Sequence, residues 1–348
     1  MSDLARLAQC SVNTVSLALR DSPRISAATR KRIHKLASES GYRTNPLVSA
    51  LISSRRTSKT AQTIAVLTKF ELPFSEMPVT PMFCVELFAG MQEKAAEMGF
   101  HLEEFTTALP KSPDAGRLTG ILRARGIHGV ILFPSGSLVT PFPELDWRHF
   151  VVVTAGFHAP QWPLHRTYLD QRRSVEICLE QLKARGYRRI GLGLTHFMDP
   201  RWGYAGSGRF LAWQVQQPAE DRVPLIDGNV TEFPAVEAFM NWVRLHRPDA
   251  VLVYDDCYIE LLERLKKTEG IDVLPVVINS TARTDMSGIT RRVERLGQIS
   301  IAVLARELYL NHYGIPESPQ VTLVSGEWRD GAGLRPLVGK KAAARPSA

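Results

Sequence analysis

The sequence predicts a small all-α head joined to a larger α/β body. At 348 residues the chain is longer than one hydrophobic core usually serves. Residues 1–60 carry 11 Lys and Arg against three Asp and Glu, so the net charge of +8 lies entirely in this segment. From residue 63 onward, continuous apolar runs alternate with amphipathic helical patterns, which is typical of parallel sheets covered on both faces. The expected parts are a head at residues 1–44, a hinge and linker at residues 45–60, a two-lobed body at residues 61–336 and a disordered tail at residues 337–348.

The composition is that of a globular protein. Apolar residues make up 44% of the chain and charged residues 22%. No apolar run in the sequence is long enough to span a membrane and the first residues lack a signal-peptide pattern, so we expect a cytoplasmic protein with no membrane partner. The cysteines lack the spacing of a metal site, so we expect no metal or other cofactor, and four buried, reduced thiols. These are Cys10, Cys84, Cys178 and Cys257.

The head is predicted to form three short helices. The first ends before a tight turn at residues 9–11, and Ser11 starts the second. Ser26 is expected to cap the third helix, which runs over residues 27–40 and ends at Gly41. Two helices joined by a turn of this length predict a helix-turn-helix.

A helix-turn-helix with a basic excess favours double-stranded DNA as the partner. The second helix is narrow enough to enter the major groove, where short polar side chains meet base edges while basic residues and helix starts contact phosphates. The alternative from composition alone is a small three-helix bundle that contacts other proteins. The concentration of charge on one small segment favours a polyanion.

Four motifs in the head resemble, in order and spacing, the LacI family of bacterial transcription regulators. They are DLARLA at residues 3–8, SVNTVS at 11–16, RISAATR at 24–30 and GYRTN at 41–45. The resemblance implies that the second helix is the recognition helix and that the hydroxyl and amide side chains around it contact phosphates or grooves. The expected DNA-binding residues are Val12, Asn13, Thr14, Ser16, Leu17, Arg20, Arg24, Ser26, Thr29, Asn45 and Leu51.

The recognition helix departs from the family pattern at one position. After the Thr-Val-Ser run the family usually has an arginine that reads a base, and this chain has Leu17. A bidentate arginine–guanine contact discriminates by about 1–3 kcal/mol, and leucine cannot form it. We therefore expect Arg20 or Asn13 to carry more of the base readout.

The segment after the head is a helix that is too short to be stable alone. Asn45 is a helix cap and Pro46 suits the first helical position, but the apolar run ends at Ile52 after about two turns. The resemblance implies that it folds only on operator DNA, where two copies from a dimer lie in the minor groove and Leu51 wedges a base step. The alternative is a linker whose apolar residues contact the body. Ser49 replaces the arginine that the family usually has in this hinge.

The body is predicted to contain two successive series of strands and helices, and hence two similar lobes. Strands are expected at residues 64–67, 101–105, 129–133, 150–154, 189–193, 223–226, 250–254 and 274–278, and helices at residues 83–98, 114–125, 174–185, 210–216, 235–246 and 257–267. Ligands of such sheets bind beyond the carboxyl ends of the strands, so we expect a small-molecule site between the lobes.

The body resembles the periplasmic-binding-protein-like effector domain of the same family. The motifs RGIHGVIL at residues 125–132 and GYRRI at 186–190 look like the third strand and the start of the second lobe. LGQIS at residues 296–300 looks like the helix that returns to the first lobe.

The resemblance implies a carbohydrate or related effector, because carboxylates suit vicinal hydroxyls and an aromatic ring suits the C–H face of a sugar. The family's pocket arginine has no match in the run at residues 205–210, and Arg201 or Arg209 could substitute. For each candidate a capping or surface role is the alternative. The expected effector-binding residues are Phe74, Asp170, Arg201, Asp255 and Asn279.

Together these patterns predict a homodimeric regulator, of the repressor type, that binds a palindromic operator under control of a small effector. An enzyme built on the α/β body is one alternative, but the sequence has no P-loop, no GxSxG elbow, no GxGxxG after a strand and no metal-spaced histidines. A secreted solute-binding protein is the other alternative, and it fits the body but not the basic head.

Overall fold

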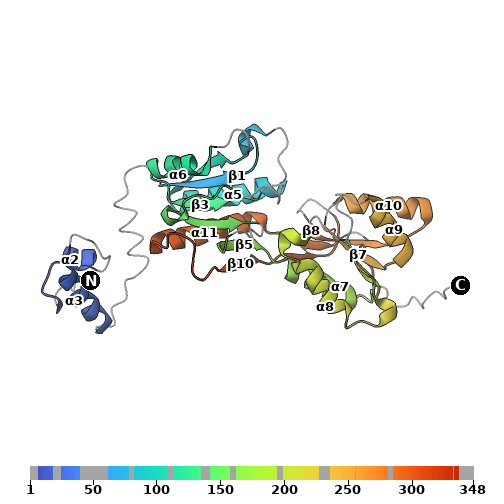
Figure 1. The fold of residues 1–348 in the computed structure, drawn as a ribbon. Coiled ribbons are helices and arrows are strands. Elements are labelled where there is room, and N and C mark those ends of the chain that lie inside the picture. The colour runs from blue at the N-terminus through green and yellow to red at the C-terminus, as the bar shows by residue number, and fades with distance from the viewer. Residues whose placement is uncertain are drawn as a thin grey trace. The chain divides into compact units, whose positions relative to one another are not determined.

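A computed structural model shows the fold of the chain, which divides into two compact units at Met1–Ala61 and Gln62–Ala348 (Figure 1). None of the helices in the described residues is long and apolar enough to cross a membrane. The structure describes residues 7–18, 25–39, 62–77, 82–108, 113–134, 142–156, 162–193, 199–226, 236–254, 256–280, 285–331 and 333–336.

The described part of the head contains α2 (Val12–Ala18) and α3 (Ala27–Glu39) around a very small core. The core side chains are spaced three or four residues apart within each helix, so each helix turns one apolar stripe inward. The buried members are Ala8, Val15, Ala18 and Ile33, and Cys10, Ile25 and Leu36 pack against them.

The first lobe of the body is built on a six-stranded parallel sheet in the order β10-β5-β4-β3-β1-β2 (Figure 1). The last strand of the sheet in the chain, β10, lies at one edge beside β5. The strands are β1 (Gln62–Thr68), β2 (Phe100–Thr106), β3 (Gly129–Leu132), β4 (Val151–Ala155), β5 (His165–Leu169) and β10 (Val321–Val324).

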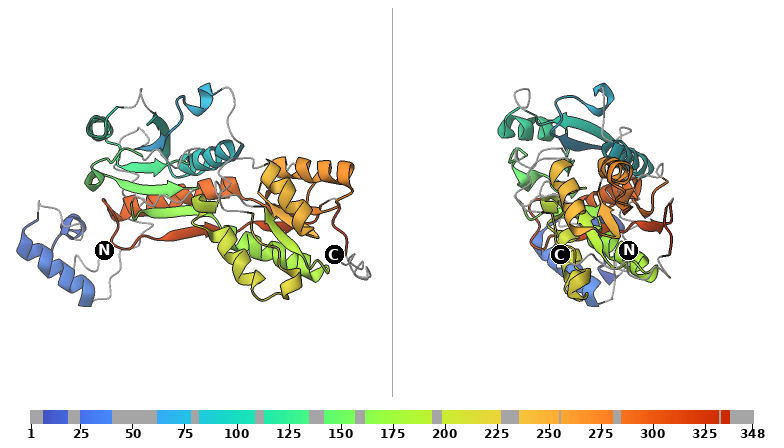
Figure 2. Two further views of the ribbon diagram at one scale, coloured as in Figure 1. Left: turned by 45° about the vertical axis from the view of Figure 1, so that its right-hand side comes forward. Right: turned by 90° about the vertical axis from the view of Figure 1, so that its right-hand side faces the viewer.

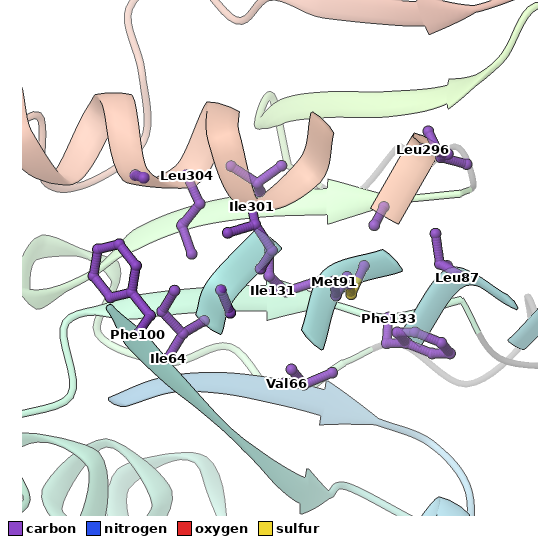
Figure 3. Packing of buried hydrophobic residues seen from close by; sticks show 14 of the residues in the cluster. Ile64, Val66, Leu87, Met91, Phe100, Ile131, Phe133, Leu296, Ile301 and Leu304 are labelled. Carbon is purple, nitrogen blue, oxygen red and sulfur yellow. The ribbon is translucent and has the colours of Figure 1, made fainter. Parts of the chain in front are cut away.

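Both faces of this sheet are covered by helices, as continuous apolar strands predict. Alternate residues of β1 and β3 point to opposite faces: Ile64 and Ile131 join one buried cluster, and Ala65 and Val130 join another. The first cluster lies under α5 (Met82–Glu97) and α11 (Val293–Leu310), and Figure 3 shows its packing. The second lies under α6 (Ala115–Ala124). Short 3-10 turns η1 (Phe74–Glu76) and η2 (Trp147–His149) complete the lobe.

The second lobe has a five-stranded sheet in the order β11-β9-β8-β7-β6, parallel except for the edge strand β11. Its strands are β6 (Ile190–Gly193), β7 (Ala250–Val253), β8 (Leu274–Ser280), β9 (Gly288–Thr290) and β11 (Glu327–Arg329). One face is covered by α7 (Gln171–Ala184) and α8 (Ala205–Gln214), and the other by α9 (Val236–His246) and α10 (Asp256–Glu269). The 3-10 turns η3 (Asp199–Trp202) and η4 (Ala219–Asp221) flank α8.

The helix that carries LGQIS returns to the first lobe, as the sequence predicts. Both views of Figure 2 show α11 beside α5, although some 200 residues of sequence separate them. The two helices approach closely because each carries a glycine that lies against the backbone of the other helix. A Cβ added to Gly90 would lie 1.9 Å from the Glu294 carbonyl oxygen, and one added to Gly297 would lie 2.2 Å from the Leu87 carbonyl oxygen. Only glycine permits this crossing.

Several predicted elements differ from the structure. The strand predicted at residues 223–226 is wrong: the segment is irregular, and its apolar ends Val223 and Ile226 are buried against α9 and α10 instead. The carbonyl of Pro224 accepts a hydrogen bond from the Trp242 indole N–H at 2.8 Å, so a side chain satisfies this stretch of backbone. Helix α8 begins five residues before the predicted start, and α7 begins three residues before it. Strands β5, β9, β10 and β11 were not predicted.

The four cysteines form no disulfide bonds, as expected, but the prediction that all four are buried is only half correct. Cys84 and Cys178 are buried, whereas Cys10 and Cys257 are partly exposed, because they lie at a turn and near the start of α10. Burial raises the pKa of the Cys84 thiol to about 12, against a smaller opposing effect of Arg291. A thiol with so high a pKa is inert near neutral pH.

Candidate functional site

The two described helices of the head begin with the same arrangement of hydroxyls. The Ser11 Oγ accepts a hydrogen bond from the Thr14 backbone N–H at 3.0 Å, and the two hydroxyls lie 2.8 Å apart. At the start of α3, the Ser26 Oγ accepts from the Thr29 N–H at 3.2 Å, again with hydroxyls 2.8 Å apart. The predicted cap at Ser26 is therefore confirmed. Each hydroxyl pair lies at a helix N-terminus, where backbone N–H groups and the helix dipole favour an anion such as a phosphate.

The turn before α2 is fixed by one unusual residue and one cross-link. Gln9 has φ of 47°, the left-handed region in which glycine is preferred. The Arg32 guanidinium on α3 donates to the Ala8 carbonyl oxygen at 3.1 Å, so α3 holds the chain just ahead of the turn. The left-handed Gln9 and the Arg32–Ala8 hydrogen bond together set the angle between the turn and α3. A helix-turn-helix needs a fixed angle there to place its second helix in a groove.

The surface of α3 is strongly cationic. Lys31, Arg32 and Lys35 are exposed, while Ile33 between them is fully buried. The helix thus separates its charges from its core face. This solvent-facing row of cations fits the sequence-independent part of DNA binding, in which lysines and arginines neutralise phosphates.

The structure places some of the predicted DNA-binding residues and leaves others outside its description. Thr14 and Leu17 are half-buried on α2, and Ser26 and Thr29 lie at the start of α3. Val12, Asn13 and Ser16 belong to α2, but their side chains lie outside the described part. Arg20, Arg24, Asn45 and Leu51 lie outside the described residues, as does the whole hinge at residues 45–60.

In the body, Phe74 lies in η1 directly after β1, at the carboxyl end of the first sheet. Its ring centroid is 4.9 Å from that of Phe88 and 4.8 Å from that of Phe133, so the ring packs on the first-lobe core. Its backbone N–H donates to the Glu104 Oε2 at 3.1 Å. Burial raises the pKa of Glu104, and its other carboxylate oxygen is buried without a hydrogen-bond partner. Phe74 is therefore at least partly a packing residue.

Asp170 is the N-cap of α7. Its Oδ1 accepts a hydrogen bond from the Arg173 backbone N–H at 2.8 Å, and the residue is 8% exposed. The capping role that the sequence left open is thus realised, so a ligand contact by this carboxylate would use the second oxygen. The cap also explains why α7 starts earlier than predicted.

The sequence did not indicate three polar or aromatic features near the carboxyl ends of the strands. Gln171, the first residue of α7, is 4% exposed, and its Oε1 has no hydrogen-bond partner. The rings of Trp202 and Tyr254 lie 4.5 Å apart at the end of the second sheet. Asp199 is buried and accepts from the Ser207 N–H at 3.4 Å. A buried amide oxygen without a partner, directly after the capping Asp170, is a polar group that a ligand can satisfy.

The remaining predicted effector residues are less completely described. Arg201 lies in η3 and Asn279 in β8, but their side chains lie outside the described part, and Asp255 lies outside the described residues. Arg209, considered as a substitute for the family's pocket arginine, pairs instead with Glu176 on α7 at 3.2 Å.

Three short connections join the two lobes. They are residue 170 between β5 and α7, residues 291–292 between β9 and α11, and residues 325–326 between β10 and β11. Ion pairs hold the connection at residues 291–292 in place: the Arg291 side chain lies 3.6 Å from the Glu86 carboxylate on α5, and Arg292 pairs with Glu327. Short connections of this kind can absorb the dihedral changes of a hinge motion between two lobes.

Comparisons with known proteins agree with these observations. Residues 1–45 match the family model described as bacterial regulatory proteins, lacI family. Catabolite control protein B of Bacillus subtilis (strain 168) is 32% identical over 202 residues, which cover 57% of this chain and 59% of that protein. The chain therefore matches less than two thirds of this relative's length.

Solved structures with low sequence identity share the fold. The complex of the transcriptional regulator CelR with cellobiose has a TM-score of 0.54 at 18% identity, and the match covers 94% of this chain and 97% of that one. The Lac repressor dimer bound to operator and the anti-inducer ONPF has a TM-score of 0.53 at 17% identity with the same coverage. A putative LacI-family regulator from Rhizobium etli has a TM-score of 0.59 at 17% identity over 79% of this chain and 99% of that one.

The two kinds of comparison cover complementary parts of the molecule. The family model covers the head with its paired Ser–Thr helix starts, and the structural likeness extends through both sheets of the body. The resemblance of the head motifs is confirmed: residues 1–45 match the model of the lacI family of bacterial regulatory proteins, and the body shares its fold with solved structures of regulators.

Proposed function

We propose that this protein is a sequence-specific DNA-binding transcription regulator of the repressor type, whose operator affinity is set by a small effector bound between the two lobes. The observation that carries the proposal is the joining of a LacI-family helix-turn-helix head to a body of two α/β lobes. The proposed activity is binding and its regulation, without catalysis.

DNA recognition is assigned to α2, with phosphates bound at the starts of α2 and α3 and along the cationic face of α3. A single head of this size gives limited specificity, so the proposal includes a homodimer on a palindromic operator, in which two half-sites multiply the discrimination. The hinge segment at residues 45–52 is proposed to fold on the DNA, with Leu51 wedged into the minor groove.

The effector is proposed to be a sugar or a related metabolite. CelR was solved with cellobiose, and the regulator CCPA from Weissella paramesenteroides was solved with glucose and with sucrose. Phe74, Asp170, Arg201, Asp255 and Asn279 remain the proposed contacts, and the partnerless Oε1 of Gln171 adds one hydrogen-bond acceptor to that set.

The proposed coupling runs through the three connections between the lobes. An effector that binds one arrangement of the lobes better than another shifts the protein toward that arrangement, and the first lobe begins with β1, which directly follows the linker. Differential affinities of about 1–3 kcal/mol, or 5- to 150-fold in binding, are typical of such coupling. A cytoplasmic, nucleoid-associated location follows from the proposed DNA partner.

Protection of the DNA that flanks the protein's own gene tests this function. We expect a nuclease footprint of two half-sites with two-fold symmetry, since a dimer binds each half-site with one head. The Leu51→Ala variant is expected to lose affinity for that site while keeping its weak binding to random duplex, because the wedge acts only on the bent, specific complex. Equal loss on both duplexes would remove the wedge from the proposal, and protection of no site would refute the proposal as a whole.

Calorimetry tests the effector site separately. Sugars that change the footprint are titrated into the wild type and into Asp255→Ala and Gln171→Ala. A weakened affinity in either variant supports the site, and unchanged affinity in both would place the effector elsewhere.

A further inference from the structure

Glu104, near the end of β2, is a carboxylate whose two oxygens are satisfied unequally. Its Oε2 accepts the Phe74 backbone N–H at 3.1 Å, and its Oε1 is buried without a hydrogen-bond partner. Burial raises the pKa of Glu104, and the hydrogen bond from Phe74 is the opposing influence. A buried carboxylate with one unpaired oxygen lowers the stability of a protein, and residues that break a local rule in this way are concentrated at functional sites.

The N–H group that Glu104 binds is one that η1 cannot satisfy from its own sequence. Phe74 is the first residue of η1, and the residue before it is Pro73, whose side chain makes no capping hydrogen bond. The first N–H groups of a helical turn have no partner inside the turn and need an acceptor from elsewhere. Glu104 supplies that acceptor from the strand beside β1, 30 residues further along the chain.

The end of β2 also holds the connection between β1 and η1. The Thr107 N–H and the Thr107 hydroxyl both donate to the Thr68 carbonyl oxygen at 2.7 Å. The Thr106 hydroxyl donates to the Phe70 carbonyl oxygen, and Glu104 then binds the start of η1. The whole connection is therefore tied to β2 at three points.

The hydrogen bond from Glu104 matters because it fixes the backbone that carries the Phe74 ring. The ring centroid lies 4.9 Å from that of Phe88 and 4.8 Å from that of Phe133, so one side of the ring is seated on the first-lobe core. Phe74 is nevertheless only half-buried at the carboxyl end of the first sheet, so part of the residue is accessible there.

We propose that Glu104 is a positioning residue of the effector site, which holds η1 so that the accessible side of Phe74 meets the ligand. This inference rests on the proposed function, in which Phe74 contacts the effector, and it adds a residue that acts through Phe74. A contact that is held in place before binding keeps affinity that would otherwise be lost in ordering the segment. The unpaired Oε1 agrees with this role, because the carboxylate is placed for one N–H group of η1.

Hydrogen exchange at the Phe74 amide, measured on the full chain without a ligand, tests the positioning directly. In Glu104→Ala the amide should exchange about tenfold faster or more, because a hydrogen bond to a charged acceptor is lost. Glu104→Gln should restore slow exchange, because the amide oxygen of glutamine can still accept the N–H. Glu103→Ala is the matched control: this neighbouring carboxylate pairs with Arg125 instead, so the exchange at Phe74 should be that of the wild type.

Calorimetry on the same variants connects the position of Phe74 to binding. Cellobiose, glucose and sucrose are the probes, because they are the sugars in solved structures that share this fold. For a sugar that binds the wild type, affinity should fall about 3- to 10-fold in Glu104→Ala and recover in Glu104→Gln, because only the alanine variant must order η1 on binding. Glu103→Ala should bind like the wild type.

The proposal is overturned if the Phe74 amide exchanges at the wild-type rate in Glu104→Ala. It is also overturned if Glu104→Ala binds a sugar as tightly as the wild type does, or if Glu104→Gln restores neither slow exchange nor affinity, since the side chain would then serve the fold alone. Binding of none of the three sugars by the wild type would count against the proposed sugar effector, and the exchange rates would still decide whether Glu104 holds η1.

Discussion

The head and the body hold their elements together by different means. The described head has four buried apolar side chains. Two Ser–Thr pairs cap its helices, and a hydrogen bond from Arg32 to the Ala8 carbonyl oxygen joins α3 to the residue before the turn. The described part of the body has four buried clusters on two sheets, and glycines on α5 and α11 let each helix pack against the backbone of the other. Small cores leave little stability in reserve, so single polar contacts matter more in the head.

This contrast predicts that packing changes should affect the body most and cap changes the head most. Calorimetric scans that resolve the unfolding of the two units are the common measurement, because each unit then serves as an internal control for the other.

The largest effect is expected for Gly297→Ala. The new Cβ would lie 2.2 Å from the Leu87 carbonyl oxygen, and neither backbone can move without separating α11 from α5. Overpacking of a tight core typically costs about 1–3 kcal/mol and more where backbone must shift, so the body transition should fall by several degrees. Gly120→Ala is the control, with no loss expected. An unchanged body transition in Gly297→Ala would show that the crossing is looser than described.

Ser26→Ala should destabilise the head alone. It removes the acceptor of the Thr29 N–H at the start of α3, a loss of about 0.5–2 kcal/mol for a helix cap. Ser26→Gly is a close control because glycine is tolerated as a cap at a cost of a few tenths of a kcal/mol. If the alanine and glycine variants unfold at the same temperature as the wild type, the hydroxyl pair contributes nothing to the stability of the head.

Acid should weaken the body through His165 on β5. The Gln320 backbone N–H donates to His165 Nδ1 at 3.1 Å, and His165 Nε2 lies 3.8 Å from the Glu307 carboxylate, which also binds Arg306 and His312. Burial lowers the pKa of His165 below its ordinary value of 6.5, although the charge of Glu307 opposes this. The unfolded chain therefore binds the proton more readily, so this contribution to stability is present above pH 6.5 and is lost as the pH falls below it.

Urea unfolding at about pH 7.5 and about pH 5.5 measures this effect. The wild type should lose more stability between the two conditions than His165→Gln, which cannot titrate. Equal losses in the two proteins would assign the acid sensitivity to other groups.

The smallest effect is expected for Gln9→Gly in the turn before α2. Glycine relieves the left-handed backbone at φ of 47°, a gain of about 1–2 kcal/mol that is offset by about 0.5–1 kcal/mol of lost chain entropy. The head transition should rise slightly and the body transition should not move. A lower head transition would show that the glutamine side chain stabilises the turn.

The elements that the sequence predicted well are those whose apolar residues repeat at a clear period. Strands β1, β3 and β7 are continuous apolar runs and were found close to their predicted bounds. Strand β5 escaped prediction because two of its buried positions are the polar residues His165 and Thr167, and the hydroxyl of Thr167 is satisfied by Ser300 on α11 at 2.6 Å. That partner lies more than a hundred residues away and leaves no local signal.

The candidate sites also differ in whether local sequence or a long-range contact determines them. The cap at Ser26 is a local arrangement, and a local pattern predicted it. Asp170 was expected from the family resemblance as an effector contact, with capping as the alternative, and the structure shows the cap. The pairing of Trp202 with Tyr254 depends on how η3 is folded against the end of β7, and no spacing in the sequence indicates it. The effector contacts therefore remain predictions, while the helix starts of the head are observed.

The most direct test of the central claim is the salt dependence of DNA binding by the full chain. Binding is compared between duplex from the protein's own promoter and a scrambled duplex of equal length. We expect promoter binding to be tighter by about 10³-fold or more, with the logarithm of affinity falling linearly as the logarithm of salt concentration rises. Equal affinity for the two duplexes at every salt concentration would contradict it.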